Sequence, residues 1–264
     1  MFCNVIIYRE DGFHNIPNLI KAYLQYKSSF IVYFVNNLAE YRNIINNLIG
    51  PFMLIMMHMF EPAITNDSIK KAYNITLECV YEHYKPQKIV YICRQSYNFK
   101  KSKIINDNIS NIININSNIV YQFVALPMDI YGPGIAVPRS VVLSNLCREC
   151  LLSADSTIYI SDEITLRPLF INDMLDSIKY ALDLDVCGTI EVIPTAYNLS
   201  HIASTIIKIL KTENSIEINP QKGRRVYQSI KTIHDMNVPT YYPDLTYSLE
   251  AGIKKYITHI KDNL

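Results

Sequence analysis

Continuous apolar runs alternate with segments of helical periodicity over the first half of the chain. The runs are too short for buried helices and are rich in β-branched residues, so they predict buried strands. These predicted strands are Val5–Tyr8, Phe30–Val35, Phe52–Met59, Lys88–Cys93 and Val120–Pro127. The predicted helices between them are Ile16–Tyr26, Leu38–Leu48, Asp67–Tyr84 and Lys103–Ile115. This alternation predicts an α/β fold, with a parallel sheet covered by helices on both faces.

The pattern becomes mixed beyond Tyr131. A YGPG turn occupies Tyr131–Gly134, and its glycines supply the backbone freedom that a turn requires. The predicted helices of this part are Ser140–Leu152, Pro168–Asp183, Ser200–Leu210 and Leu249–Ile260.

Composition narrows the function classes. The chain has 264 residues, 49% of them hydrophobic, and a net charge of +1, so no global field attracts it to nucleic acid or to an anionic membrane. No apolar run approaches the roughly 20 residues needed to span a bilayer, and the N-terminus lacks the pattern of a signal peptide. The six dispersed cysteines indicate buried thiols rather than a disulfide framework. We therefore expect a soluble, cytoplasmic protein.

Several motifs of the second half resemble one family when they are read in order. After the YGPG turn come TLRPLFINDMLDSIKYAL, GTIEVIPTAYNLSHIASTIIKIL, KGRRVYQSIKTIHDM and YYPDLTYSLEAGIKKYI. In order and spacing they resemble the extended short-chain dehydrogenase/reductases, the NAD-dependent nucleotide-sugar epimerases and dehydratases. The resemblance implies a Rossmann-like parallel sheet with helices on both faces, here over residues 1–130. It also implies a smaller C-terminal α/β substrate lobe over residues 131–264, interleaved with the first domain.

The resemblance also assigns a cofactor turn, which is degenerate in this chain. A dinucleotide turn uses three glycines for a tight bend, for approach of the pyrophosphate and for helix packing. The family pattern falls on YREDGFHN at residues 8–15, where only Gly12 and Phe13 match. Arg9 and Asn15 replace the outer glycines.

Charge and neighbouring positions depart from the family as well. Glu10 and Asp11 place two carboxylates where a diphosphate would lie, and like charges at a few ångströms cost roughly a kcal/mol even in solvent-like dielectric. Asn36 stands where an acidic residue would hold the adenosine ribose, while His58 fits a segment beside the cofactor. NAD or NADP would be the cofactor of an active member; the alternative is that none binds.

The interval between the second and third predicted strands is short. Residues 36–51 leave room for one helix but not for the helix, strand and helix of the family. The missing strand would be the edge strand of the sheet, so its loss is tolerable.

The catalytic pattern is also incomplete. Tyr97-x-x-x-Lys101 matches the family pair in which the tyrosine exchanges the substrate proton and the lysine lowers its pKa. Cys93, Arg94 and Gln95 occupy the place of the family's serine or threonine. The alternative reading is that Tyr97 and Lys101 are surface residues at the start of a helix.

Substrate-binding positions are better preserved. They are Tyr131, Arg167, Arg224 and Arg225. Guanidinium groups suit the diphosphate of a UDP- or dTDP-linked sugar because they donate paired hydrogen bonds to phosphate oxygens. The alternative for Arg167 is a local pair with Asp173 or Asp162.

A metal site is not expected. Cys147 and Cys150 have metal-ligand spacing, but no second pair follows at suitable distance, so they are interpreted as ordinary thiols.

Three functional hypotheses follow. The first is a pseudoenzyme with weakened or lost NAD(P) binding that either still binds a nucleotide sugar or uses the fold as a partner surface. The second is an active NAD(P)-dependent epimerase, dehydratase or reductase, and the third is a structural partner of an active relative. The resemblance implies dimerisation through a four-helix bundle, which the Asp67–Tyr84 and Lys103–Ile115 helices would supply in a homodimer or a heterodimer.

Overall fold

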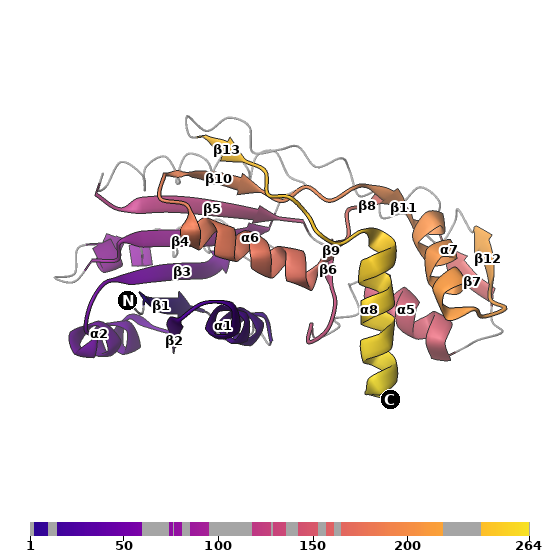
Figure 1. The fold of residues 1–264 in the computed structure, drawn as a ribbon, viewed down its shortest axis with the longest axis horizontal. Coiled ribbons are helices and arrows are strands. Elements are labelled where there is room, and N and C mark those ends of the chain that lie inside the picture. The colour runs from indigo at the N-terminus through magenta and orange to yellow at the C-terminus, as the bar shows by residue number, and fades with distance from the viewer. Residues whose placement is uncertain are drawn as a thin grey trace. The chain divides into compact units, whose positions relative to one another are not determined.

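The computed structural model describes residues 3–9, 15–59, 74–75, 77–80, 85–94, 118–127, 129–135, 142–152, 157–160, 165–218 and 239–263. The chain forms two compact units (Figure 1). Unit 1 comprises Met1–Leu126, Leu175–Val192 and Ile230–Pro243. Unit 2 comprises Pro127–Met174, Ile193–Ser229 and Asp244–Leu264. Each unit is therefore built from segments that are distant in the sequence.

Unit 1 contains a parallel sheet of seven strands in the order β13-β10-β5-β4-β3-β1-β2. The strands are β1 (Cys3–Tyr8), β2 (Phe30–Val35), β3 (Phe52–Met59), β4 (Lys88–Arg94), β5 (Val120–Leu126), β10 (Gly188–Glu191) and β13 (Thr240–Tyr241). The predicted parallel sheet is confirmed, and its first five strands lie where the apolar runs predict them. The sequence analysis missed β10 and β13, which are four and two residues long.

Helices of unit 1 begin at local signals in the sequence. Helix α1 (Ile16–Lys27) has a proline in its first turn, where the missing N–H costs nothing. Helix α2 (Leu38–Asn47) begins at Asn37, whose side chain accepts a hydrogen bond from Glu40 N at 2.9 Å, while the Glu40 carboxylate accepts one from Asn37 Nδ2. Of the predicted Asp67–Tyr84 helix, residues 74–75 and 77–80 are helical, and the rest lies outside the described residues. The Lys103–Ile115 helix lies outside them entirely.

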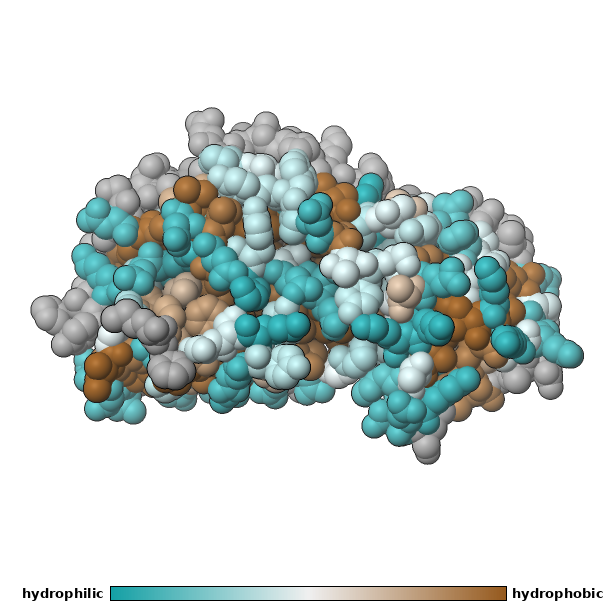
Figure 2. All heavy atoms as spheres, viewed as in Figure 1, coloured by the Kyte–Doolittle hydropathy of each residue, from teal (hydrophilic) through white to brown (hydrophobic). Residues whose placement is uncertain are grey.

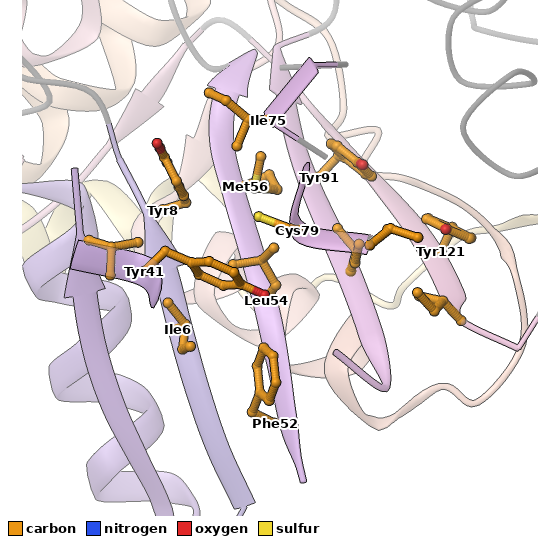
Figure 3. Packing of buried hydrophobic residues seen from close by; sticks show 14 of the residues in the cluster. Ile6, Tyr8, Tyr41, Phe52, Leu54, Met56, Ile75, Cys79, Tyr91 and Tyr121 are labelled. Carbon is orange, nitrogen blue, oxygen red and sulfur yellow. The ribbon is translucent and has the colours of Figure 1, made fainter. Parts of the chain in front are cut away.

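One face of the sheet carries an extended hydrophobic cluster (Figure 3). Alternate residues of β1, β3, β4 and β5 meet the apolar side of α2 and the helical residues Ile75, Cys79 and Val80 there. Large rings fill the space: Tyr91 stacks on Phe123 at 4.8 Å, and Tyr41 meets the edge of Phe52 at 6.3 Å. Such interdigitation at alternate strand positions fixes the register, because a slip by one residue would turn every inward side chain outward.

A buried lysine links the sheet to α6 (Ile171–Asp183). The Lys88 side chain is almost fully buried, donates to Leu182 O and pairs with Asp185 at 3.1 Å. A cation at the C-terminal end of a helix is favourable because the last carbonyls carry partial negative charge.

Unit 2 contains short strand pairs and three helices among its described residues. The pairs are β6 (Ile130–Tyr131) with β9 (Leu169–Phe170), β7 (Thr157–Ile160) with β12 (Ser215–Ile218), and β8 (Thr165–Leu166) with β11 (Tyr197–Asn198). The helices are α5 (Val142–Leu152), α7 (Leu199–Leu210) and α8 (Leu249–Asp262).

The predicted helix Pro168–Asp183 is wrong at its start. Leu169 and Phe170 form β9, and Leu169 N donates to Asp129 O at 2.8 Å, so the helix begins at Ile171. Pairing with a segment some forty residues earlier in the chain has overridden the local periodicity.

Within the described ranges, no helix combines the length and the apolar character needed to cross a bilayer. Figure 2 shows that polar residues cover most of the visible surface and that apolar residues reach it beside α2.

Candidate functional site

The candidate cofactor region of unit 1 lies where β1 and β2 end. Ligands of open α/β sheets bind outside the carboxyl ends of the strands. β1 ends at Tyr8 and is followed by Arg9, and the neighbouring β2 ends at Val35 and is followed by Asn36. Sequence reasoning placed the cofactor turn and the ribose-binding position at these two strand ends.

Arg9 is held against the end of β2 by several contacts. Its backbone N–H donates to Val35 O at 2.9 Å, and its Nε donates to Asn36 Oδ1 at 3.0 Å. Its Cζ lies 4.7 Å from the centre of the Phe34 ring, a cation–π distance. The guanidinium is therefore anchored at the end of β2, where the sequence resemblance predicted the ribose position.

Lys21 adds a second cation to this ring. Its Nζ lies 5.0 Å from the centre of the Phe34 ring, and it reaches there from α1. Sequence reasoning missed Phe34 and Lys21, and no motif marks them, because the contact joins a helix to a strand end.

Asn36 is fixed from its other side by α2. Its backbone N–H donates to Glu40 Oε2 at 2.8 Å, and its Nδ2 lies 3.4 Å from the same oxygen. The amide is thus oriented with its donor toward Glu40 and its acceptor toward Arg9. At the position where the sequence resemblance expects a ribose contact, the amide oxygen of Asn36 is therefore occupied by Arg9.

The short interval after β2 has the predicted consequence. Residues 36–51 contain α2 as their only helix and no strand, so β2 is the end strand of the sheet and pairs with β1 alone among the described strands. The predicted loss of the third strand is confirmed.

Several predicted positions cannot be placed. Gly12, Phe13, Tyr97, Lys101, Arg224 and Arg225 lie outside the described residues, as do Glu10 and Asp11. The backbone of His58 lies in β3, where the register with β4 shifts between Met56 and Met59.

In unit 2, Tyr131 is part of a packed aromatic cluster. Its side chain is 1% exposed, and its ring meets Phe170 at 5.5 Å and Tyr256 at 6.2 Å, both edge-on. Burial raises the pKa of its hydroxyl well above the ordinary value of 10.0. The buried ring supports a packing role for this predicted substrate-binding residue.

Two glycines make this packing possible. Gly132 has φ +137°, and a Cβ there would lie 2.5 Å from Cγ2 of Ile171. A Cβ on Gly252 would lie 2.2 Å from the Tyr131 hydroxyl oxygen. The YGPG turn therefore brings β6 against α6, and Gly252 brings α8 against Tyr131.

Arg167 lies between β8 and β9 and is half-buried. Its Nη1 donates to Pro194 O at 3.0 Å. Asp173, one of its two predicted alternative partners, accepts from Thr246 N at 2.8 Å and from Tyr247 N at 3.3 Å. The other, Asp162, lies outside the described residues.

Unit 2 also has an open groove of about 440 Å³ beside α7. One helical face of α7 and the start of α8 line it, with the Tyr197 ring stacked on the imidazole of His201 at 5.3 Å. Lys208 and Glu250 give it mixed charge. Sequence reasoning missed this groove, although the spacing of His201, Thr205 and Lys208 along α7 places them on one side of the helix.

Cys147 and Cys150 are buried free thiols on α5. Burial raises the pKa of both, that of Cys150 to about 11. No cluster of metal ligands occurs in the part of the chain that the structure describes. Both thiols therefore lie in the buried hydrophobic interior.

Comparison with known proteins identifies the fold. No model of a known protein family matches the sequence, and no curated protein matches it. Solved structures do match over the full length of the chain. UDP-glucose 4-epimerase from Thermotoga maritima, solved with UDP-glucose, superposes with a TM-score of 0.69 at 13% identity and covers 100% of this chain and 99% of its own.

Two further structures agree. UDP-N-acetylglucosamine 4-epimerase from Bacillus cereus gives a TM-score of 0.68 at 12% identity, covering 98% of this chain and 99% of its own. dTDP-glucose 4,6-dehydratase from Bacillus anthracis, in complex with NAD, gives 0.66 at 12% identity, covering 100% and 97%. The chain therefore has the fold of the extended short-chain dehydrogenase/reductases, the fold of these nucleotide-sugar epimerases and dehydratases.

Proposed function

We propose that this chain is a divergent epimerase/dehydratase-like protein in which NAD(P) binding is weakened or lost and a nucleotide sugar still binds. The observation that carries the proposal is the position of Arg9. Its side chain is bonded to Asn36 and stacked on Phe34 at the strand ends where the fold binds a dinucleotide.

Cofactor binding would compete with these contacts. The ribose of a bound dinucleotide needs acceptors at the end of β2, where Asn36 offers a single neutral amide oxygen that already accepts from Arg9 at 3.0 Å. Moving Arg9 away would forfeit that hydrogen bond and the cation–π contact together, each worth on the order of 1 kcal/mol. The carboxylates of Glu10 and Asp11 in the same turn add repulsion toward a diphosphate.

Substrate binding rests on the arginines of unit 2. Arg167 is already oriented by its hydrogen bond to Pro194 O, and an oriented guanidinium loses little entropy when it binds phosphate. We assign it, with Arg224 and Arg225, to the diphosphate of a UDP- or dTDP-linked sugar.

A thermal-shift titration tests the proposal. UDP-glucose or dTDP-glucose should raise the melting temperature, while NAD(H) and NADP(H) at sub-millimolar concentration should not. Arg167→Ala should abolish the shift with the sugar nucleotide. Arg148→Ala, an exposed arginine on α5, should keep it. Clear stabilisation by either dinucleotide would contradict the loss of cofactor binding.

The alternative function is an active enzyme that uses NADP. It is favoured by the two cations at the end of β2, Arg9 and Lys21, beside a neutral Asn36. A 2′-phosphate prefers basic neighbours, whereas the ribose of NAD prefers an acidic one. This alternative requires stabilisation by NADP(H) but not NAD(H), and turnover that Tyr97→Phe abolishes.

A further inference from the structure

The open groove beside α7 has the size of a ligand site. It lies where α7 meets the start of α8 (Figure 1). Its volume is about 440 Å³, and ligand pockets span roughly 300–1,000 Å³. The described residues that line it all belong to unit 2, and Arg167 is not among them. A ligand in the groove would therefore be held apart from the diphosphate that we assign to Arg167.

Two parallel rings line one part of the groove. The Tyr197 ring, from β11, stacks on the His201 imidazole of α7 at 5.3 Å, with 8° between the ring planes. Tyr197 covers one face of the imidazole, and His201 is exposed, so the other face is open to a ligand. The face of an aromatic ring carries partial negative charge and attracts polarised C–H groups. The stack therefore favours a ligand whose C–H groups are polarised by neighbouring oxygen atoms.

The hydroxyl groups of α7 in the lining are acceptors toward a ligand. Ser204 Oγ donates to Ser200 O at 2.8 Å. Thr205 Oγ1 donates to His201 O at 2.8 Å as well. Because a hydroxyl has one hydrogen, each of these oxygens has only lone pairs left. The exposed carboxylate of Glu250, on α8, adds two more acceptor oxygens, so the groove favours a ligand with several donors.

The lining also contains donors, and its charges balance. Ser248 Oγ accepts from Ala251 N at 3.2 Å, so its hydrogen is available, and the Lys208 ammonium is a further donor. Among the described residues, neither Lys208 nor Glu250 is in an ion pair. Lys208 disfavours a cation in the groove and Glu250 disfavours an anion. The lining therefore suits a neutral ligand that carries hydroxyl groups.

We propose that this groove binds a neutral saccharide. The face of a sugar ring presents polarised C–H groups to the aromatic stack. Its hydroxyl groups both donate and accept, so they match the acceptors Ser204 and Thr205 as well as the donor Lys208. A free monosaccharide and a unit of an oligosaccharide share this chemistry, and the groove is open enough for either. The proposal does not depend on nucleotide-sugar binding at Arg167.

Ligand-observed NMR titrations of the full chain test the proposal. The probes are glucose, N-acetylglucosamine and maltotetraose, with inorganic phosphate and glycine as ionic comparisons. Glu250→Gln should weaken saccharide binding about tenfold, because a hydrogen bond to a carboxylate is lost. His201→Ala should weaken it about fivefold by removing a ring from the stack. Glu213→Gln is the matched control, since Glu213 is an exposed carboxylate of the same unit that does not line the groove, and it should leave binding unchanged.

The choice of probe separates the two sources of the saccharide. Binding of glucose or N-acetylglucosamine identifies a free sugar, and binding of maltotetraose alone identifies a saccharide chain; both support the proposal. Three results overturn it: no saccharide binding at tens of millimolar, binding that Glu250→Gln leaves unchanged, or a preference for phosphate or glycine over every saccharide.

Amide chemical shifts of the wild type decide the case even if a variant fails to fold. A saccharide should shift the amides of His201, Thr205 and Glu250. UDP, which has a diphosphate but no hexose, should instead shift those around Arg167. Arg167→Ala should lose UDP binding and keep saccharide binding, so either proposal can fail without the other. Saccharide shifts confined to the neighbours of Arg167, or saccharide binding that Arg167→Ala abolishes, contradict a site in the groove.

Discussion

Unit 1 and unit 2 build their cores in different ways. In unit 1 the core consists of alternate residues of long parallel strands, and their neighbours follow from strand register. In unit 2 the core around Tyr131 joins residues from β6, β9 and α8, and two glycines leave room for the contact. The core of unit 1 follows from the alternation of side chains along strands in register. The core of unit 2 depends on close contacts at Gly132 and Gly252, where an added Cβ would overlap a neighbouring side chain.

The two units also differ in how far their sequences depart from the pattern that the fold family predicts. Unit 1 has no strand between β2 and β3, and Arg9 and Asn15 stand at two positions where a dinucleotide turn has glycine, while the sheet remains regular from Phe30 to Val35. Unit 2 has kept the YGPG turn, whose Gly132 has a backbone angle that other residues rarely adopt. A packed sheet tolerates divergence at its strand ends, but a close contact between chain segments does not.

The largest expected effect is that of Gly132→Ala. The substitution adds strain at φ +137° and a Cβ 2.5 Å from Ile171, so we expect a loss of about 3 kcal/mol in the free energy of unfolding. Gly50→Ala is the control in unit 1, because Gly50 also has positive φ but no heavy atom lies within 4 Å of the added Cβ. It should cost about 1 kcal/mol in urea unfolding. Equal losses would contradict the tight packing of unit 2.

Asp173→Asn should cause the second-largest loss in the free energy of unfolding. The buried carboxylate accepts from the backbone N–H groups of Thr246 and Tyr247, and an amide in its place cannot accept from both equally well. We expect a loss of about 2 kcal/mol. Asp183→Asn, on the same helix, removes only the exposed pair with Lys179 and should cost less than about 0.5 kcal/mol. Chemical denaturation of both variants measures the difference.

Gly252→Ala should have a smaller effect. Its Cβ would overlap the Tyr131 hydroxyl at 2.2 Å, but alanine also favours the helix, so the net loss should be about 1 kcal/mol. In a Tyr131→Phe background the overlapping oxygen is gone, and the same alanine should cost less or stabilise. A double-mutant cycle measures this coupling, and its absence would place the two residues out of contact.

Titration should have no effect on stability at neutral pH and should act only above pH 9. Burial raises the pKa of Cys150 from 9.0 to about 11, so between these values the unfolded state releases a proton that the folded state keeps. Stability is therefore full below pH 9 and falls as the pH rises toward 11. Cys150→Ala should reduce this slope in unfolding measurements above pH 9. An unchanged slope would assign the loss to other groups, such as Tyr121, whose pKa burial raises to about 12.

Local patterns were sufficient for most of unit 1. The apolar runs at Val5–Tyr8 and Phe30–Val35 predicted β1 and β2, because a buried parallel strand must be apolar on both faces. The short interval before Phe52 also predicted the missing strand. β10 was missed because four residues give too little pattern to separate a strand from a loop.

The sequence by itself determined the parallel sheet, helices α1 and α2 and the scarcity of glycine in the first turn, since these depend on neighbouring residues along the chain. Only the tertiary structure decided that Arg9 is held by Asn36 and Phe34 and that Tyr131 is buried against Gly252. Those contacts join residues that are 25 or more positions apart, and no local periodicity specifies which distant side chains will meet. The contacts of Arg9 at the ends of β1 and β2 are therefore known only from the tertiary structure.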